Sequence, residues 1–107
     1  MNNTVFIINV VGVTYSNNDG SSRQNYISKM KLNDNIIIEK EPDNPYDSNA
    51  IKVLYGDGLQ IGYLPMNKSE LITSYINMGY KVSVSLVSIN GGTDGYNYGC
   101  TIELKIK

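Results

Sequence analysis

Residues 41–53, with the sequence EPDNPYDSNAIKV, constrain the fold most, because dense turn chemistry there directly precedes a strand-forming run. Proline disfavours helical backbone at the residue before it, and Asn and Asp side chains hydrogen-bond to nearby backbone amides. Residues 41–49 are therefore predicted to form an ordered loop. Residues 50–55 are predicted to form a strand, because they are mostly apolar and include the strand-favouring residues Ile51, Val53 and Tyr55. The chain should present Tyr46 and Asp47 on this loop, although loops without a functional role have a similar composition.

Composition excludes several classes of active site. The chain of 107 residues has no histidine and one cysteine, Cys100. Zinc fingers, Ser-His-Asp triads and Cys-His proteases need residues that are missing, and a lone cysteine forms no internal disulfide. No glycine-rich phosphate loop of the GxxxxGK type is present. We therefore expect no metal, no cofactor and no enzymatic activity. The alternative is a magnesium-dependent nuclease that uses turn carboxylates such as Asp43, Asp47 and Asp57.

Charge and length limit the partners. Nine basic residues against ten acidic residues give a net charge of −1. Duplex DNA binding without sequence preference depends on neutralising phosphates, so a nucleic-acid function would need a local site. The nine tyrosines offer such a site, although most tyrosines in a small protein are structural.

We expect one domain over residues 1–107. No apolar run could span a membrane and residues 1–4 lack a basic signal start, so a soluble, cytoplasmic protein is expected.

Apolar patterning predicts a mainly β fold with two short helices. Gly56-Asp57-Gly58 is a strong hairpin signal, and Gly62 indicates a bulge or a close approach by another group. Asn67 and Glu70 form a capping-box pattern for the second helix, which should end at Gly79. Six strands with short turns favour a small antiparallel barrel or sandwich. The predicted strands are 5–13, 36–39, 50–55, 59–64, 82–86 and 102–106, and the predicted helices are 24–30 and 67–78.

Three separated motifs together resemble the HIRAN domain. They are VVGVTY at residues 10–15, EPDNPYDSNAIKV at residues 41–53 and LQIGYLP at residues 59–65, and the resemblance runs from about residue 5 to about residue 106. The family includes domains fused to DNA-dependent ATPases of fork repair and stand-alone bacterial and phage proteins. The resemblance implies an OB-like or SH3-like β-barrel that captures the 3′-hydroxyl end of single-stranded DNA in an aromatic pocket.

The resemblance also assigns roles to individual residues. Tyr46 would stack on the terminal base, and Asp47 would accept a hydrogen bond from the free hydroxyl. Asn44 would brace the loop or contact the sugar, and Tyr15 would form part of the pocket wall. Arg23 belongs to an Arg-Gln signature of the stand-alone members and would contact phosphate; alternatively it is a solvated surface charge. The remaining aromatic candidates are Tyr63 in the third motif and Tyr96 or Tyr98 before the last strand.

Two departures from the family pattern bear on function. Thr14 and Met66 stand where eukaryotic members have basic residues, so two phosphate contacts are missing. Arg23, Lys52 or Lys68 could replace them. The expected partners are single-stranded DNA 3′ ends and a DNA-repair ATPase or nuclease. The alternative function is a protein-interaction or regulatory adaptor that keeps the barrel and has lost the DNA pocket.

Overall fold

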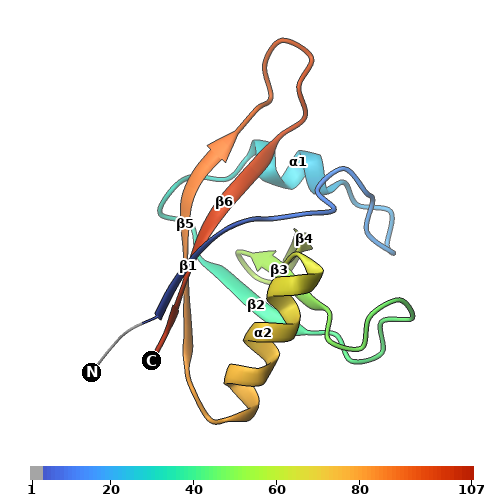
Figure 1. Ribbon diagram of the computed structural model, residues 1–107. Coiled ribbons are helices and arrows are strands. Elements are labelled where there is room, and N and C mark those ends of the chain that lie inside the picture. Colours follow the sequence, from blue (N-terminus) through green and yellow to red (C-terminus); the bar gives the residue numbers. More distant parts are fainter. Residues whose placement is uncertain (1–3) are drawn as a thin grey trace.

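Six strands and two helices make up the fold in the computed structural model, which describes residues 4–107 (Figure 1). The strands form two three-stranded antiparallel sheets, one in the order β1-β6-β5 and the other in the order β2-β3-β4. Residues 1–3, on which part of the signal-sequence argument depends, lie outside the described residues. The elements are β1 (Thr4–Asn9), α1 (Arg23–Ser28), β2 (Ile36–Lys40), β3 (Ile51–Tyr55), β4 (Leu59–Tyr63), α2 (Met66–Asn77), β5 (Val82–Asn90) and β6 (Gly99–Ile106).

Alternating side chains explain the first sheet. β6 is its central strand, and β6 buries Ile102, Leu104 and Ile106 while the residues between them are less buried. β1 pairs with β6 from Thr4 opposite Ile106 to Asn9 opposite Thr101. Successive side chains of a strand point to opposite faces, so this pattern directs one face of the sheet into the core. The structure confirms the predicted strands in this region and extends β5 and β6 toward the glycine-rich turn.

The second sheet contains the predicted hairpin. β3 and β4 are joined by Gly56-Asp57-Gly58 and pair in antiparallel register. The register shifts between Val53 and Leu54, so the expected irregularity beside Gly62 is present. An added Cβ at Gly62 would lie 2.5 Å from the backbone oxygen of Val11. Gly62 therefore allows the chain that leaves β1 to pass directly over β4.

The predicted mainly β class is confirmed, but the two sheets do not close into one barrel. Among the described residues, one bridge joins the chain after β1 to β4: it pairs Val11 with Tyr63, whose amides and carbonyls form two hydrogen bonds of 2.9 Å. β2 and β5 of the two sheets also lie in contact. Gly12 follows with a positive φ of 70°, which turns the chain away before a longer ladder can form. β1 ends at Asn9, before the predicted end of the strand, because the chain then leaves β6 and Val11 pairs with Tyr63.

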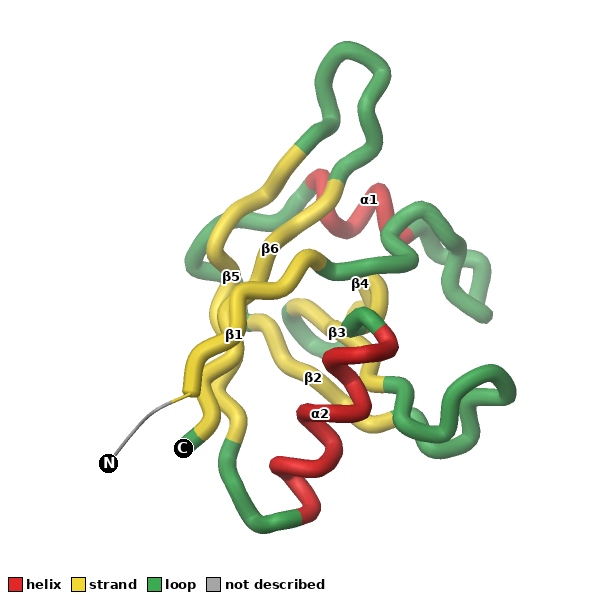
Figure 2. The backbone as a smooth tube through the Cα atoms, in the orientation of Figure 1, coloured by secondary structure: helices red, strands yellow, loops and turns green. Residues whose placement is uncertain are grey.

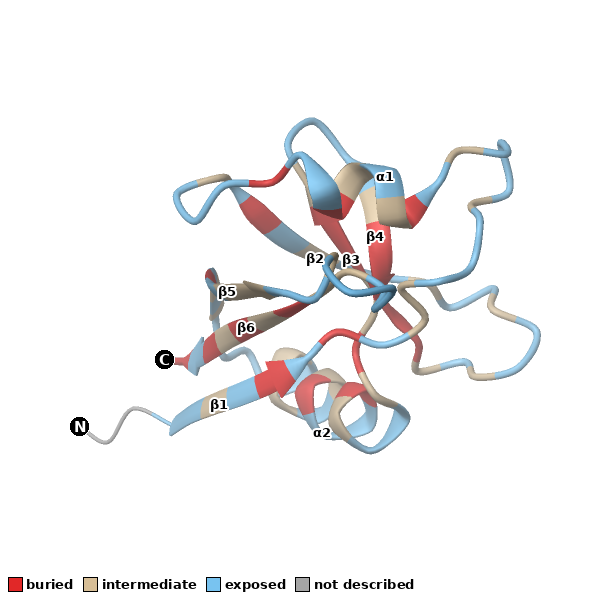
Figure 3. Ribbon diagram, turned by 90° about the horizontal axis from the view of Figure 1, so that it is seen from above, coloured by how far each residue is buried: buried red, intermediate tan, exposed pale blue. Residues whose placement is uncertain are grey.

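Isoleucines from both sheets fill the core, and the two helices cover opposite sides of it (Figures 2 and 3). Ile27 of α1 and Ile72 of α2 are both fully buried. Burying one such side chain contributes about 1.5–3 kcal/mol of transfer free energy. The helices therefore hold the sheets together where no hydrogen-bonded ladder does. The most buried members of this core are Ile27, Ile51, Ile61, Ile72, Ile102, Leu104 and Val53.

The start of α2 differs from the prediction. The helix begins at Met66 with Pro65 as its N-cap residue, and no side chain caps it. The backbone oxygen of Pro65 accepts hydrogen bonds from the amides of Lys68 and Ser69, both at 2.9 Å. Asn67 is already inside the first turn, so the predicted capping box of Asn67 with Glu70 is wrong. The predicted stop at Gly79 is confirmed by its φ of 91°, directly after the C-cap residue Met78.

The apolar stripe of α2 is only partly directed into the protein. Ile72 is buried, and Tyr75 and Ile76 pack against the core. The apolar residues Leu71 and Met78 fall on the same helical face in the sequence, but both remain exposed and do not pack into the core. Within residues 4–107, no helix is long and apolar enough to cross a membrane.

Candidate functional site

The loop of residues 41–49 is held in shape by its own side chains. Asn44 Oδ1 accepts hydrogen bonds from the amides of Tyr46 at 2.8 Å and Asp47 at 3.1 Å. Asp47 Oδ1 accepts a hydrogen bond from the amide of Asn49 at 2.9 Å. These are the local Asx contacts expected from the sequence. They leave the Tyr46 ring 91% exposed on an ordered loop.

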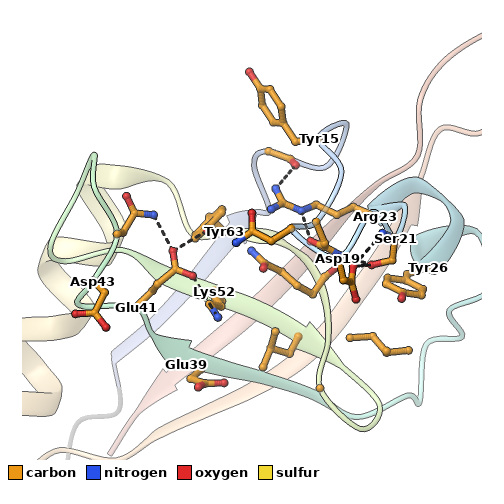
Figure 4. A pocket seen from close by; sticks show the side chains of 18 of the residues that line it. Tyr15, Asp19, Ser21, Arg23, Tyr26, Glu39, Glu41, Asp43, Lys52 and Tyr63 are labelled. Carbon is orange, nitrogen blue, oxygen red and sulfur yellow. Dashed lines mark hydrogen bonds and ion pairs between the residues drawn. The ribbon is translucent and has the colours of Figure 1, made fainter.

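Glu41 connects this loop to the second sheet. Its Oε1 accepts hydrogen bonds from Tyr63 Oη and Asn44 Nδ2, both at 2.8 Å, and Lys52 Nζ lies 3.2 Å from its Oε2 (Figure 4). Burial of the Glu41 carboxylate acts to raise its pKa, but the hydrogen bonds from Tyr63, Asn44 and Lys52 together with the Lys52 charge outweigh burial. The pKa of Glu41 is therefore held below its ordinary value, so the side chain is an ionised anchor at neutral pH.

Two pockets lie on either side of this connection and share Asn44, Tyr46 and Tyr63. The small pocket has a volume of about 220 Å³ and the large pocket about 1180 Å³. Among the described residues, Asp47 is the one charged group that lines the small pocket. The small pocket is lined by Val11, Asn44, Tyr46, Asp47, Ala50, Tyr63, Leu64 and Met66. A mostly apolar space with one carboxylate suits a flat or apolar group that carries a hydrogen-bond donor.

Asp47 has acceptor capacity that the protein does not fully use. Its Oδ2 lies 3.5 Å from Ser69 Oγ, which also lies 2.9 Å from the backbone oxygen of Met66. A serine hydroxyl has a single proton, and the shorter contact with Met66 takes it. Asp47 Oδ2 is therefore only weakly satisfied and can accept a hydrogen bond from a ligand. Ser69 is 1% exposed and belongs to the first turn of α2, so this carboxylate lies beside the start of that helix.

The large pocket has a strongly acidic lining. Four carboxylates and two cationic groups face it, namely Asp19, Glu39, Glu41 and Asp43 with Arg23 and Lys52 (Figure 4). Lys52 is already paired with Glu41. Tyr15, Tyr26, Tyr46 and Tyr63 also line this pocket. Aromatic surface is therefore present in the large pocket, but its charge does not favour phosphate.

Arg23 is buried beneath the large pocket. It is 7% exposed, and its guanidinium donates from Nε to Asn17 Oδ1 at 2.7 Å and from Nη1 to the backbone oxygen of Gly12 at 2.8 Å. The guanidinium also lies over the Tyr63 ring, 5.3 Å from the centroid. Its alternative interpretation as a solvated surface charge is therefore wrong. Arg23 joins the turn after β1 to β4.

Gln24 has a matching structural role beside Arg23. Gln24 Nε2 donates to the backbone oxygens of Val13 at 2.9 Å and Tyr98 at 2.8 Å, and Gln24 Oε1 accepts from the amide of Tyr98 at 2.7 Å. Two adjacent residues of α1 thus bind the carbonyls of the adjacent residues Gly12 and Val13. The Arg-Gln pair fixes the turn that presents Tyr15, whose ring is 71% exposed.

The structure brings together most of the predicted site residues. Tyr15, Arg23, Asn44, Tyr46 and Tyr63 line the large pocket, and Asp47 joins three of them in the small pocket. Tyr96 and Tyr98 line neither pocket. Tyr98 packs against the core, and Tyr96 is 74% exposed on the loop between β5 and β6, which projects away from the 41–49 loop (Figure 1).

Three cationic side chains were proposed to replace the two missing basic residues, and all three already contact other groups of the protein. Lys52 pairs with Glu41, and Arg23 is bonded to Asn17 and Gly12. Lys68 Nζ lies over the Phe6 ring, 5.3 Å from its centroid. Met66 lines the small pocket and is 65% exposed, so it supplies apolar surface at the position where the resemblance implied a basic residue. The described site therefore depends on aromatic and apolar contact more than on cations.

Two site residues escaped the sequence analysis. Glu41 belongs to the motif of residues 41–53, but a carboxylate in a turn is usually solvated and so attracted no attention. Its hydrogen bond with Tyr63 joins the loop to β4, which local sequence does not reveal. Ser69 gave no signal, because its burial depends on how α2 packs beside the loop. Among residues 4–107, no group of three or more His, Cys, Asp or Glu side chains could hold a metal ion.

The fold and the pockets define a small two-sheet β domain whose candidate site lies at one Asx-rich loop. Comparison with known proteins identifies the family: the sequence model of the HIRAN domain family matches residues 3–107. The chain belongs to the HIRAN domain family. It spans about 8% of the length of the curated relatives described next.

Among these relatives, the helicase-like transcription factor of Oryctolagus cuniculus is 35% identical over 82 residues, which are 76% of this chain and 8% of the relative. The Fanconi-associated nuclease 1 homolog of Arabidopsis thaliana is 32% identical over 73 residues, which are 61% of this chain and 8% of the relative. The sequence similarity therefore covers one small region of much longer proteins.

Two solved structures share the fold. The crystal structure of the HIRAN domain of human HLTF superposes with a TM-score of 0.69 at 20% identity, over 95% of this chain and 74% of that chain. A protein from Lactobacillus plantarum superposes with a TM-score of 0.68 at 14% identity, over 99% of this chain and 100% of that chain. At these identities the similarity establishes the fold.

Proposed function

We propose that this domain binds single-stranded DNA by its 3′-hydroxyl end, in the small pocket. The observation that carries this proposal is the acceptor capacity of Asp47 Oδ2 in a mostly apolar pocket beside the exposed Tyr46 ring. A carboxylate accepts hydrogen bonds and donates none, so it selects a ligand with a free hydroxyl. A 3′-phosphate lacks that donor and brings negative charge against the carboxylate.

Stacking would supply most of the affinity. Base stacking on an aromatic side chain contributes about 1–3 kcal/mol per base and does not depend on sequence. Tyr46 offers an almost fully exposed ring, and Tyr63 and Met66 provide further surface in the same pocket. A volume of about 220 Å³ lies below the range of about 300–1,000 Å³ that is typical of pockets for whole small molecules. It therefore suits a single terminal nucleotide that is partly exposed.

The domain would act as a binding module that brings a DNA end to a partner. The relatives are named as a helicase-like transcription factor and a nuclease homolog, and each is far longer than this chain. A DNA-repair ATPase or nuclease is accordingly the expected partner, and DNA repair or replication-fork processing is the expected setting. No catalytic role is assigned to the domain itself.

A second function is favoured by a specific observation. The four carboxylates of the large pocket would attract a basic peptide more readily than a phosphate backbone. A protein-interaction adaptor would have this property. It would bind a partner protein and ignore oligonucleotides, whereas the leading proposal requires measurable binding of a short DNA strand.

Fluorescence anisotropy with a short single-stranded DNA tests the leading proposal. The strand with a 3′-hydroxyl should bind more tightly than the same strand with a 3′-phosphate, and Tyr46→Ala should weaken binding by roughly 5–100-fold, the loss of one stacked base. Tyr96→Ala removes another largely exposed tyrosine, which lies outside both pockets, and provides the matched control. Equal binding of both strands, or equal effects of the two variants, would remove the small pocket from consideration.

A further inference from the structure

We propose that the acidic lining of the large pocket confines DNA contact to the 3′-terminal nucleotide, with Glu39 and Asp43 as the residues that set this limit. Nucleotides added on the 5′ side would then contribute no affinity. This inference rests on the proposed binding of a 3′ end in the small pocket. It concerns how many nucleotides contribute to affinity, which recognition of the terminal hydroxyl does not determine.

The two pockets are continuous in their walls. Asn44, Tyr46 and Tyr63 line both, so a strand whose terminal nucleotide occupies the small pocket would have the large pocket directly beside it. The next phosphates of such a strand would lie near the lining of the large pocket. The charge of that lining therefore decides whether further nucleotides are attracted or repelled.

The cationic groups of the large pocket are already occupied. Lys52 Nζ lies 3.2 Å from Glu41 Oε2, so this pair presents little net charge. Arg23 is 7% exposed, is hydrogen-bonded to Asn17 and Gly12, and lies against the Tyr63 ring. To reach a phosphate, Lys52 would have to leave Glu41, and Arg23 would have to break the hydrogen bonds that fix the turn after β1.

The acidic groups are free by comparison. Glu39 and Asp43 are exposed at the large pocket, and neither has a hydrogen-bond or ion-pair partner within residues 4–107. Asp19, also exposed, accepts hydrogen bonds from the amide and hydroxyl of Ser21, which leaves its charge in place. Figure 4 shows Glu39, Glu41 and Asp43 on the wall that β2, β3 and the 41–49 loop form. The solvent-facing charge of the pocket is thus negative.

Salt dependence follows from this arrangement. Proteins that contact several phosphates lose affinity steeply as salt rises, because binding releases counterions. Here added phosphates meet carboxylates, and salt screens that repulsion over a Debye length of about 10 Å at 0.1 M. The affinity for a long strand should therefore rise with salt, which is opposite to ordinary DNA binding.

A length series tests the inference. Oligothymidylates of two, four and twelve nucleotides, all with a 3′-hydroxyl, are titrated at low and at physiological salt. We expect their affinities to agree within about twofold at physiological salt, and the longest strand to gain affinity as salt rises. Steadily tighter binding with length, together with a loss of affinity at higher salt, would overturn the inference.

A charge variant sharpens the test. Glu39→Gln combined with Asp43→Asn should tighten binding of the twelve-nucleotide strand by about fivefold and leave the dinucleotide within about twofold. Both side chains are exposed, so the fold should tolerate the change. Asp34→Asn combined with Glu103→Gln makes the same change in net charge outside both pockets and should leave length dependence unaltered. An equal gain in this control would attribute the effect to net charge and would contradict the role of the pocket.

The outcomes separate the two proposals. If 3′-hydroxyl strands bind better than 3′-phosphate strands at every length but affinity climbs with length, terminal capture stands and the limit set by Glu39 and Asp43 fails. If no length shows a preference for the 3′-hydroxyl, the proposed function itself fails, and the length limit fails with it.

Discussion

The phenolic oxygen of Tyr63 donates a hydrogen bond of 2.8 Å to Oε1 of Glu41, and this contact joins the end of β4 to the start of the 41–49 loop. The same carboxylate oxygen accepts from Asn44, which in turn binds the amides of Tyr46 and Asp47. One chain of hydrogen bonds thus runs from the second sheet to the proposed binding residues. The geometry of the pocket depends on it.

Removing Glu41 should destabilise the protein. Glu41→Ala deletes the acceptor of Tyr63, Asn44 and Lys52, and the expected loss is about 1–3 kcal/mol in the free energy of unfolding. Urea denaturation followed by circular dichroism measures it. Glu39→Ala, an exposed carboxylate without a partner in the described chain, should change stability by no more than about 0.5 kcal/mol. Similar midpoints for the two variants would contradict the anchoring role of Glu41.

Stability should fall at acid pH, in part through Glu41. Its pKa in the folded protein lies below the ordinary value of 4.5, so its contribution is complete above that value and is lost as pH falls through the folded pKa. The pKa of Asp19 is lowered by hydrogen bonds from Ser21, so Asp19 acts in the same direction. Urea midpoints from about pH 7 to about pH 3 should therefore decline less steeply for Glu41→Gln than for the parent. An identical decline would contradict this assignment.

Gly62 should not tolerate a side chain. An alanine Cβ would lie 2.5 Å from the Val11 oxygen and 2.7 Å from Val10 Cγ1, so the bridge between the sheets would have to shift. Such overpacking costs about 1–3 kcal/mol. Gly99→Ala is the matched control, because nothing lies within 4 Å of its added Cβ. Thermal denaturation should place Gly62→Ala well below Gly99→Ala, and equal midpoints would refute the close approach at β4.

The Cys100 thiol should be inert in the folded protein. It is 2% exposed, and burial raises its pKa from 9.0 to about 11. A thiol reagent at about pH 8 should modify it only after unfolding, since the thiolate is the reactive form. The raised pKa also means that this group favours folding below about pH 9 and that its contribution is lost as pH rises toward about 11. Rapid modification without denaturant would show that Cys100 is accessible.

Local signals predicted much of the fold. The hairpin of β3 and β4 followed from Gly56-Asp57-Gly58 between two strand-forming runs, and the two interpretations of Gly62 were both confirmed. The bracing role of Asn44 followed from Asx chemistry over two or three residues. Each of these features depends on residues close together in the sequence, and propensity and turn geometry apply there directly.

Features that join distant segments could not be predicted. The burial of Arg23 depends on Gly12 and Tyr63, which different elements supply. The capping box at Asn67 had the right residues, but Pro65 began the helix one residue earlier. Closure of the sheets was limited to the bridge at Val11, because the positive φ of Gly12 turned the chain away. Local patterns carry no information about such contacts.

The central claim is that Asp47 recognises a free 3′-hydroxyl, and the most direct test is the ratio of affinities for 3′-hydroxyl and 3′-phosphate strands in the parent and in Asp47→Asn. Asparagine keeps an acceptor for the Asn49 amide but removes the charge. The parent should prefer the hydroxyl by about tenfold or more, and the variant should lose most of that preference through weaker hydroxyl binding and stronger phosphate binding. Asp57→Asn, outside both pockets, should keep the parental ratio. An unchanged ratio in Asp47→Asn would contradict the account.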